Sequence, residues 1–291
     1  KANKGATSIN FRKLMSAKAF SLSAYYDSVV SNWLNDKLEI KFPEKKTIHG
    51  KLIENLRYGE NPHQQSSIYS SVENLGLEKL HGKELSYNNY SDIYNAISIL
   101  HSLKKNKGVV IIKHNNPCGV SSDKNQINSF KNAFMCDPIS AFGGIVALNR
   151  QVNHLLANNL TSNFFEVILA PSFTKKALII LSKKNKLILV NTKNFKKDNK
   201  LDIKSVSNGY LIQEKNNILI QKKDLKCVSN KISNSVVVND LIFALKVCKH
   251  VKSNAVVLAK NQKTISIGAG QMSRINAIKI ALNQINNKKI D

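Results

Sequence analysis

A short apolar run, Val109-Val110-Ile111-Ile112, constrains the fold of this 291-residue chain more than any other segment. Its β-branched residues and its length predict a buried strand, and the apolar periodicity on either side predicts helices over residues 92–105 and 127–136. Strands that alternate with helices are typical of α/β proteins, in which functional side chains stand at strand ends. The residues directly after the run are therefore the first candidates for a functional site.

Lys113 and His114 follow the run directly. A cation beside an imidazole disfavours protonation of the ring by like-charge repulsion, which keeps His114 able to accept a proton near neutral pH. The two residues are therefore candidates for an acid and a base that act together. Taken alone, they fit equally well a surface lysine and a hydrogen-bonded histidine at a turn formed by Asn116-Pro117 and Gly119.

The rest of the chain continues the alternation of helices and strands. Residues 11–34 predict a helix with a broad apolar face, and the polar stretch 36–49, which contains Pro43, predicts a connector. A second round of elements repeats the order of the first, although no residue-level repeat is visible. The further elements expected are strands at 144–148, 254–259 and 264–267, a strand within the Lys- and Asn-rich stretch 183–200, a helix at 239–251, a hairpin turn at 261–263 and a helix from Gln271.

The net charge of +25, from 44 Lys and Arg against 19 Asp and Glu, would ordinarily indicate a nucleic-acid-binding protein. The excess is spread as separate pairs, such as Lys175-Lys176, Lys183-Lys184 and Lys222-Lys223, without an arginine-rich stripe or an aromatic RNA-binding motif. Such a surface attracts small anions by electrostatic steering. We therefore expect no specific nucleic-acid partner. The alternative, a basic nucleic-acid-binding protein, would bind with an affinity that falls steeply with salt.

The remaining features are typical of a soluble cytoplasmic protein. The four cysteines (Cys118, Cys136, Cys227 and Cys248) are widely spaced without a C-x-x-C motif, which favours reduced thiols. No apolar run approaches the ~18 residues that a membrane helix needs, so we expect no membrane partner. Residues 1–7 lack the apolar centre of a secretory signal.

Four motifs, taken in order along the chain, carry a resemblance to a known family. They are residues 56–64 (LRYGENPHQ), 113–119 (KHNNPCG), 137–145 (DPISAFGGI), and 253–257 (SNAVV) continuing into 267–274 (IGAGQMSR). In this order they resemble the transformylase half of the bifunctional purine biosynthesis family, AICAR transformylase/IMP cyclohydrolase. The resemblance covers nearly the whole chain.

The resemblance implies an α/β fold of two cytidine-deaminase-like α/β/α units, preceded by the last helix of a cyclohydrolase domain. Residues 1–46 are then the C-terminal end of the cyclohydrolase domain and a linker, and residues 47–291 are the AICAR transformylase domain, truncated at its C-terminus. The family's cyclohydrolase body and its late Phe-Phe-Pro-Phe-like segment have no counterpart in the sequence, so the chain looks like an internal fragment. The family also implies a homodimer.

The implied reaction transfers a formyl group from the co-substrate 10-formyltetrahydrofolate to the 5-amino group of AICAR, giving FAICAR in IMP biosynthesis. The full-length protein would also cyclise FAICAR to IMP. By resemblance, His114 is the general base that takes a proton from the weakly nucleophilic amine. Lys113 stabilises the oxyanion and the leaving folate nitrogen, and Asn254 orients His114 or the formyl oxygen.

The resemblance also assigns residues that bind the substrate. Arg57 and Tyr58 would hold the phosphate, and Arg274 would hold an anion at a helix start. Gly143 would allow close approach of the base, and Glu166 would accept hydrogen bonds from the ribose or the base. Taken alone, Arg57 and Tyr58 fit better a salt-bridged arginine and a core tyrosine in an ordinary turn. Glu166 fits equally well a carboxylate that simply ends a helix or strand.

The sequence predicts no metal site. A zinc deaminase needs P-C-x-x-C after an H-x-E motif, and Pro117-Cys118 is followed by no cysteine at that spacing. Cys118 is therefore expected to be a small buried apolar residue. The alternative to an enzyme is a non-catalytic nucleotide- or folate-binding module, in which Arg57, Tyr58 and Arg274 bind while the acid/base pair is idle.

Overall fold

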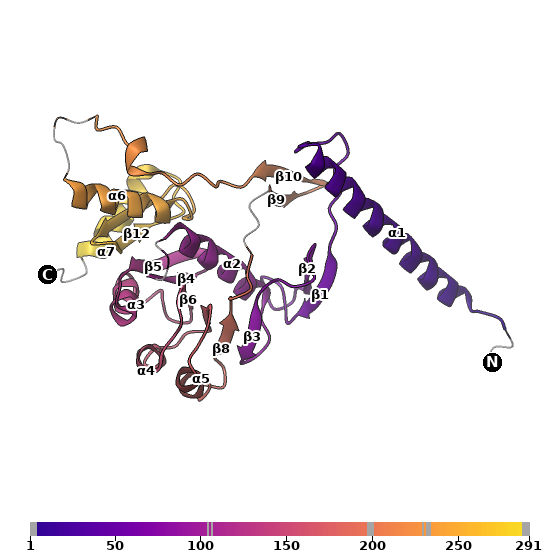
Figure 1. Cartoon of the computed structure of the whole chain (residues 1–291), viewed down its shortest axis with the longest axis horizontal. Helices are drawn as coiled ribbons and strands as arrows, with labels where there is room; N and C mark the ends of the chain where they lie inside the picture. Colours follow the sequence, from indigo (N-terminus) through magenta and orange to yellow (C-terminus); the bar gives the residue numbers. More distant parts are fainter. Residues whose placement is uncertain are drawn as a thin grey trace. The chain divides into compact units, whose positions relative to one another are not determined.

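The computed structural model describes residues 5–103, 105, 107–196, 201–228, 230 and 234–286. The chain forms two compact units, with the elements labelled in chain order in Figure 1. One unit comprises Lys1–Asn55 and Ser67–Leu75, and the other comprises Leu56–Ser66 and Gly76–Asp291. The second unit contains the large sheet and six of the seven α-helices of the described residues.

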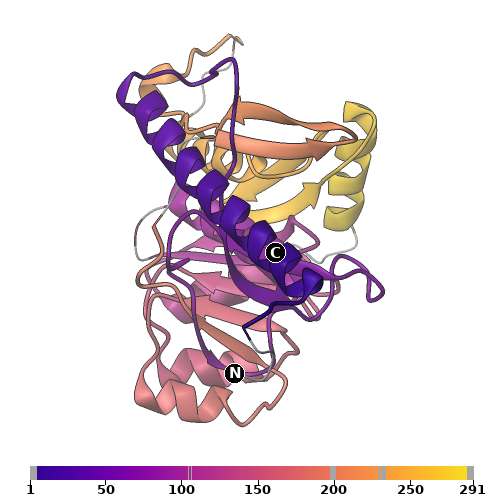
Figure 2. The same ribbon diagram turned by 90° about the vertical axis from the view of Figure 1, so that its right-hand side faces the viewer.

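The first unit is built on one long helix. α1 (Ile9–Lys37) begins after the N-cap Ser8, whose side chain accepts a hydrogen bond from the Phe11 N–H at 3.2 Å, and it runs unbroken (Figure 2). This confirms the helix predicted at 11–34. Its apolar face is not covered, because Ser28 is the one buried residue within α1. The exposed large apolar residues of α1 are Ile9, Phe11, Leu14, Phe20, Leu22, Tyr26, Val29, Val30, Trp33 and Leu34.

The segment after α1 folds back along the helix. Asn32 Nδ2 donates to the Ser28 carbonyl at 2.8 Å and to the Thr47 carbonyl at 3.1 Å. Lys46 Nζ donates to Asn32 Oδ1 at 2.8 Å. One helical asparagine therefore fastens this irregular polar stretch, which was expected as a connector, to the body of the first unit.

The second unit contains a mixed sheet of eight strands in the order β11-β12-β5-β4-β6-β7-β8-β3. The pairs β6/β7 and β7/β8 are parallel, and the other pairs are antiparallel. The strands are β3 (Glu78–His81), β4 (Gly108–Lys113), β5 (Asn116–Ser122), β6 (Ile145–Leu148), β7 (Val167–Ala170), β8 (Ile188–Asn191), β11 (Val256–Lys260) and β12 (Lys263–Gly268). Two smaller sheets pair β1 (Lys51–Leu56) with β2 (Ser66–Ser70), and β9 (Leu201–Val206) with β10 (Gly209–Glu214).

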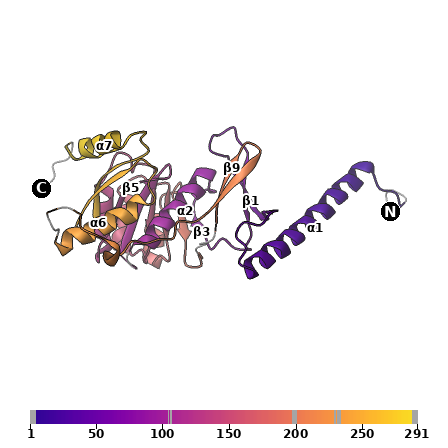
Figure 3. The ribbon, with the colours of Figure 1, turned by 90° about the horizontal axis from the view of Figure 1, so that it is seen from above.

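Helices cover both faces of the eight-stranded sheet, which gives a three-layer α/β/α arrangement (Figure 1). Val110 and Ile112 of β4 pack in the core beneath α2 and α6, whereas Val109 and Ile111 pack in the core beneath α3, α4 and α5. α7 lies on the side of the strands opposite α6 (Figure 3). The helices are α2 (Tyr87–Ser102), α3 (Gln126–Phe134), α4 (His154–Thr161), α5 (Lys175–Leu181), α6 (Ser235–Cys248), α7 (Arg274–Asn286) and the short 3-10 helix η1 (Lys222–Asp224).

Two helices approach the sheet closely, each at a glycine. A Cβ at Gly119 in β5 would lie 1.9 Å from the carbonyl oxygen of Ala133 in α3. A Cβ at Gly268 in β12 would lie 2.0 Å from the carbonyl oxygen of Ala277 in α7. Glycine is required at both positions, because any side chain would displace a helix from the sheet.

The predicted elements are confirmed in type and order, with shifts of a few residues at their ends. β4, β6, β11 and β12 match the predicted strands, β8 lies within the stretch 183–200, and α2, α3, α6 and α7 match the predicted helices. The hairpin at 261–263 is also confirmed, because Asn261 and Gln262 connect β11 to β12 with positive φ angles of 53° and 57°. The general α/β class is therefore confirmed, as a mixed sheet.

One prediction, a turn formed by Asn116-Pro117 and Gly119, is wrong. The chain turns earlier, at His114 (φ 51°) and Asn115 (φ 61°), and residues 116–122 form β5. A two-residue hairpin turn of type I′ needs positive φ at both central positions, and asparagine adopts this conformation more readily than most residues. Pro117 is tolerated in the strand because the pairing of β4 with β5 shifts register beside it, so that its missing N–H interrupts no regular ladder.

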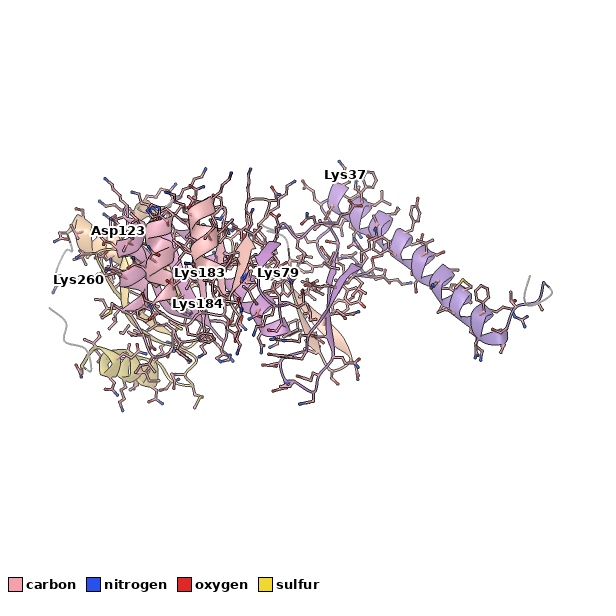
Figure 4. The ribbon with its side chains drawn as sticks, turned by 90° about the horizontal axis from the view of Figure 1, so that it is seen from below. Lys37, Lys79, Asp123, Lys183, Lys184 and Lys260 are labelled. Carbon is pink, nitrogen blue, oxygen red and sulfur yellow. The ribbon has the colours of Figure 1, made fainter. Side chains whose placement is uncertain are left out.

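Basic side chains are spread over separate elements of the second unit (Figure 4). Lys79 lies in β3 and pairs with Glu84, Lys183 and Lys184 follow α5, and Lys260 ends β11. This agrees with the dispersed pairs seen in the sequence. Throughout the part of the chain that the structure describes, every helix is too short or too polar to span a membrane.

Candidate active site

The tip of the β4–β5 hairpin carries the predicted acid/base pair. Lys113 is half-buried at the end of β4, and His114 is exposed as the first residue of the turn. Lys113 Nζ donates to the Phe142 carbonyl at 2.7 Å. A Cβ at Gly143, which has φ 71°, would lie 4.0 Å from the same Nζ. The lysine therefore lies against the loop that leads into β6, and Gly143 leaves open the space beside it.

Helix α2 holds this turn through its polar face. The two carboxylate oxygens of Asp92 accept hydrogen bonds from the His114 N–H at 3.1 Å and the Asn115 N–H at 2.6 Å. Ser91 Oγ donates to Asn115 Oδ1 at 2.8 Å, and Asn95 Nδ2 donates to the Asn115 carbonyl at 2.6 Å. The turn that presents His114 is thus fixed by three side chains of one helix.

Asp92 is 8% exposed, and this burial raises its pKa above the ordinary value. The N–H groups of Asn115 and His114 oppose the rise, because they stabilise the ionised carboxylate. The nearby His114 side chain also lowers the pKa of Asp92, whereas the Glu166 carboxylate raises it.

Glu166 lies directly before β7 and faces the same region. Its Oε2 accepts a hydrogen bond from Asn89 Nδ2 at 3.0 Å, and its N–H donates to the Gly144 carbonyl at 3.0 Å. Asn89 is 4% exposed and belongs to the capping box of α2 with Ser86. The N-terminal turn of α2 therefore orients one oxygen of the Glu166 carboxylate.

Two exposed aromatic rings lie beside Gly143. Phe142 is 63% exposed and Phe164 is 41% exposed, and their ring centroids are 5.1 Å apart. The Gly143 N–H donates to the Phe164 carbonyl at 2.9 Å, which joins the two loops that carry the rings. An apolar aromatic surface is thus placed next to the Lys113 ammonium.

The segment that contains Asn254 reaches the hairpin through its neighbours. The Lys252 N–H donates to Asn116 Oδ1 at 3.3 Å, which joins this segment to the start of β5. Asn254 Nδ2 donates to the Gln271 carbonyl at 3.0 Å and to the Met272 carbonyl at 3.2 Å. The amide of Asn254 therefore holds the loop that leads into α7.

Arg274 is the first residue of α7 and is exposed. It stands two residues after Met272, so the Asn254 contacts also fix the loop that presents it. Gly270 within this loop has φ 66°, a conformation that favours glycine. Arg274 is joined to the hairpin through this chain of contacts.

Arg57 and Tyr58 interact with each other. Arg57 Nη2 donates to Tyr58 Oη at 2.9 Å, and the guanidinium carbon lies 4.6 Å from the centroid of the Tyr58 ring. Arg57 is exposed, so its remaining donors face solvent. Asn88 Nδ2 donates to the Glu60 carbonyl at 3.1 Å, which ties this loop to the start of α2. The structure thus shows neither a salt-bridged Arg57 nor a buried Tyr58 in the described residues.

Four residues of the site were not predicted from the sequence: Asn89, Asp92, Phe142 and Phe164. Phe142 stands within the motif at 137–145, next to Gly143, and was available as a signal. Asn89 and Asp92 are ordinary polar residues of a helix in sequence terms. Their role depends on the burial of one helix face against the hairpin turn, which residue spacing alone does not reveal.

Cys118 occupies β5 and is 8% exposed, which confirms the predicted small buried residue. Burial raises the pKa of its thiol to about 12, and the nearby Asp137 carboxylate acts in the same direction. Among the described residues, no three His, Cys, Asp or Glu side chains are placed to hold a metal ion together.

At about pH 8, a thiol reagent such as a maleimide is expected to label the exposed Cys227 at least ~100-fold faster than Cys118, because the thiolate is the reacting species. Mass spectrometry of peptides sampled over time measures both rates in one experiment. The Cys227→Ser variant should lose the fast reaction. Comparable labelling of Cys118 and Cys227 in the folded protein would contradict the burial described for β5.

Comparison with known proteins identifies relatives of this chain. The sequence profile described as "AICARFT/IMPCHase bienzyme" matches residues 1–284. The chain is 44% identical over 298 residues to the "Bifunctional purine biosynthesis protein PurH" of Persephonella marina, which covers 99% of this chain and 57% of that protein. It is 40% identical over 288 residues to the protein of the same name from Bradyrhizobium diazoefficiens, covering 96% of this chain and 54% of that protein.

A third relative with the same name, from Aquifex aeolicus, is 41% identical over 289 residues, covering 98% of this chain and 56% of that protein. The chain therefore spans about half the length of the curated relatives that it matches.

Proposed function

Because the chain belongs to the AICARFT/IMPCHase bienzyme family, we propose that it carries the formyl-transfer site of purine biosynthesis. The reaction moves the formyl group of 10-formyltetrahydrofolate to the 5-amino group of AICAR and gives FAICAR. The full-length protein also cyclises FAICAR to IMP. The observation that carries the proposal is the hairpin tip, where Lys113 and His114 are consecutive residues and the turn is held by polar groups of α2.

His114 is the general base of the proposed reaction. The lone pair of the AICAR amine is delocalised into its imidazole ring, so a base must take a proton as the nitrogen attacks the formyl carbon. His114 is exposed at the tip of the hairpin and is therefore accessible to a substrate. The His114 N–H donates to the Asp92 carboxylate, so the backbone that carries the imidazole is fixed.

Lys113 stabilises the charges that develop. The attack converts the formyl oxygen into an oxyanion, which the ammonium group stabilises. When the bond between the formyl carbon and the folate N10 breaks, N10 receives a proton from Lys113, the acid of the pair. The net result is one formyl group moved from N10 to the amine, with one proton moved the other way.

The remaining residues bind and orient AICAR. Arg57 and Tyr58 hold its phosphate, since a guanidinium with outward donors and an adjacent hydroxyl are suited to phosphate oxygens. Glu166 accepts hydrogen bonds from the ribose or the base, and the open space at Gly143 beside Phe142 and Phe164 admits a flat ring.

Asn254 and Arg274 complete the proposed site from the second round of elements. Asn254 holds the loop before α7 and so fixes the position of Arg274, which attracts an anionic group of a substrate. The contact between Lys252 and Asn116 supports a common site for the two rounds of elements.

The order β5-β4-β6-β7-β8 with helices on both faces supports one complete cytidine-deaminase-like unit, and α6-β11-β12-α7 supports the beginning of a second. Residues 1–46 are the end of the cyclohydrolase domain with its linker, and residues 47–291 belong to the transformylase domain. The full-length protein is a cytoplasmic homodimer whose partners are AICAR and folate.

Replacing Arg57 by alanine in the full-length protein is expected to weaken binding of AICAR far more than binding of its unphosphorylated riboside. A hydrogen bond between a guanidinium and a phosphate stabilises the complex by about 1.5–3 kcal/mol, which corresponds to roughly 10- to 100-fold in Kd. Isothermal titration of both ligands against wild type and Arg57→Ala measures the difference. Equal losses for the two ligands would show that Arg57 does not contact the phosphate.

Formyl transfer by the wild-type protein is the direct test of the proposed function. Chromatographic detection of FAICAR, in the presence of AICAR and 10-formyltetrahydrofolate, measures it. Tight binding of both substrates without any product would support the non-catalytic binding module instead. Binding of duplex DNA or RNA that survives physiological salt would support the nucleic-acid alternative.

A further inference from the structure

In each of two hairpins of the large sheet, an aspartate of the preceding helix holds the turn. Asp92 is the sixth residue after the N-cap Ser86 of α2, and Asp240 is the sixth residue after the N-cap Asn234 of α6. Each helix leads into a hairpin, β4–β5 in the first case and β11–β12 in the second. The structure therefore shows a repeat at the level of single residues that the sequence alone did not.

The contacts of the two aspartates match in detail. Asp92 accepts hydrogen bonds from the N–H groups of His114 and Asn115, at 3.1 Å and 2.6 Å. Asp240 accepts them from the N–H groups of Asn261 and Gln262, both at 2.8 Å. All four turn residues have φ between 51° and 61°. In both hairpins a helical carboxylate thus satisfies two N–H groups of a left-handed turn.

The surroundings of the two turns differ. The first turn lies beside Lys113 and Glu166, which interact with Phe142 and Asn89. The second turn lies at the other end of the strands, because Lys263 at the start of β12 pairs with Ser121 at the end of β5. Each aspartate therefore accepts the same two backbone hydrogen bonds, and Asp240 accepts one more, from Gln262 Nε2 at 3.1 Å. Only Asp92 holds a turn that carries a residue of the proposed site.

We propose that Asp92 is the positioning residue of the site: it fixes the left-handed backbone of His114 and so directs the imidazole toward the substrate. Left-handed conformations are unfavourable for histidine, so the turn needs an external hold to keep this geometry. The buried carboxylate supplies that hold through two N–H groups.

This inference rests on the proposed function, and the second hairpin supplies its control. Asp92→Asn and Asp240→Asn each preserve the size of the side chain but replace one acceptor oxygen with an amide that cannot accept. Both variants in the full-length protein should lower the melting temperature by similar amounts. Only Asp92→Asn should lower kcat for formyl transfer, by roughly 10- to 100-fold, the loss typical of a slightly misplaced catalytic group.

The affinity for AICAR, measured by titration, should change by less than about 3-fold in both variants, since Asp92 acts on the base and not on substrate binding. Equal losses of kcat in the two variants would overturn the positioning role, and so would a normal kcat in Asp92→Asn. A loss confined to AICAR affinity would overturn it as well. If Asp92→Asn does not fold, Asp92→Ser paired with Asp240→Ser answers the question, because serine removes the carboxylate without placing an amide against the turn.

The wild-type assay distinguishes a failure of the proposed function from a failure of the positioning role of Asp92. A full-length wild type without formyl transfer overturns the proposed function and with it the role of Asp92. An active wild type whose Asp92 variants keep their kcat overturns the positioning role alone.

Discussion

The His114→Ala variant of the full-length protein is expected to transfer formyl groups at least ~100-fold more slowly than wild type, with a much smaller change in AICAR affinity. The reason is the loss of the group that takes the proton from the amine during attack. Steady-state kinetics give kcat, and titration with AICAR gives Kd. The exposed His154 at the start of α4 offers a matched control, and His154→Ala should leave both values unchanged.

Lys113→Ala should reduce kcat to a similar extent, because the oxyanion and the leaving nitrogen lose their cation. Its control is Lys175→Ala, which removes an exposed lysine of α5 away from the hairpin. Near-normal kcat in His114→Ala or Lys113→Ala would remove that residue from the mechanism. A parallel loss of kcat and of AICAR affinity would indicate a role in binding instead.

The substitution Gly119→Ala is expected to destabilise the second unit severely, by about 3 kcal/mol or more. The new methyl group would lie 1.9 Å from the carbonyl oxygen of Ala133, and this oxygen belongs to helix backbone that cannot move without lifting α3 from the sheet. Urea unfolding followed by circular dichroism measures the free energy of unfolding.

Gly209→Ala provides the control for this substitution. Gly209 begins β10, and a Cβ built there meets no atom within 4 Å. Its free energy of unfolding should therefore stay within about 0.5 kcal/mol of the wild-type value. A loss below about 1 kcal/mol in Gly119→Ala would show that α3 can shift away from β5 more easily than its packing indicates.

Much of the sheet could be predicted because its strands are continuous apolar runs. Residues 109–112 have this character since both faces of β4 are buried, one against α2 and α6 and the other against α3. β5 could not be predicted in the same way. Pro117 and Gly119 have low strand propensity, and their place in β5 depends on a register shift and on the close approach of α3.

The candidate site shows a similar division. Lys113, His114, Gly143 and Glu166 were predicted, and the structure joins them through direct contacts with their neighbours at the end of β4. The residues that orient them were missed, because a polar residue on a helix is ordinarily read as part of the solvated surface. Asp92 precedes His114 by 22 residues, and only the packing of α2 across the hairpin brings its carboxylate to the turn.

The apolar face of α1 was predicted from its periodicity, and the structure leaves it uncovered. Periodicity reports that a helix has an apolar side, but it does not report what covers that side. The same limit applies to the four motifs, which indicated the site without the contacts that arrange it.

The two edge strands of the large sheet differ in how readily they can pair with a further strand. β3 is four residues long, carries Glu78, Lys79 and His81, and so resists the addition of another strand. β11 begins with Val256, Val257 and Leu258, and among the described residues no strand pairs with it on the side away from β12. Its unpaired amide and carbonyl groups form a template for a neighbouring chain. Pairing with a strand of another chain is therefore expected at the β11 edge of the large sheet and not at the β3 edge.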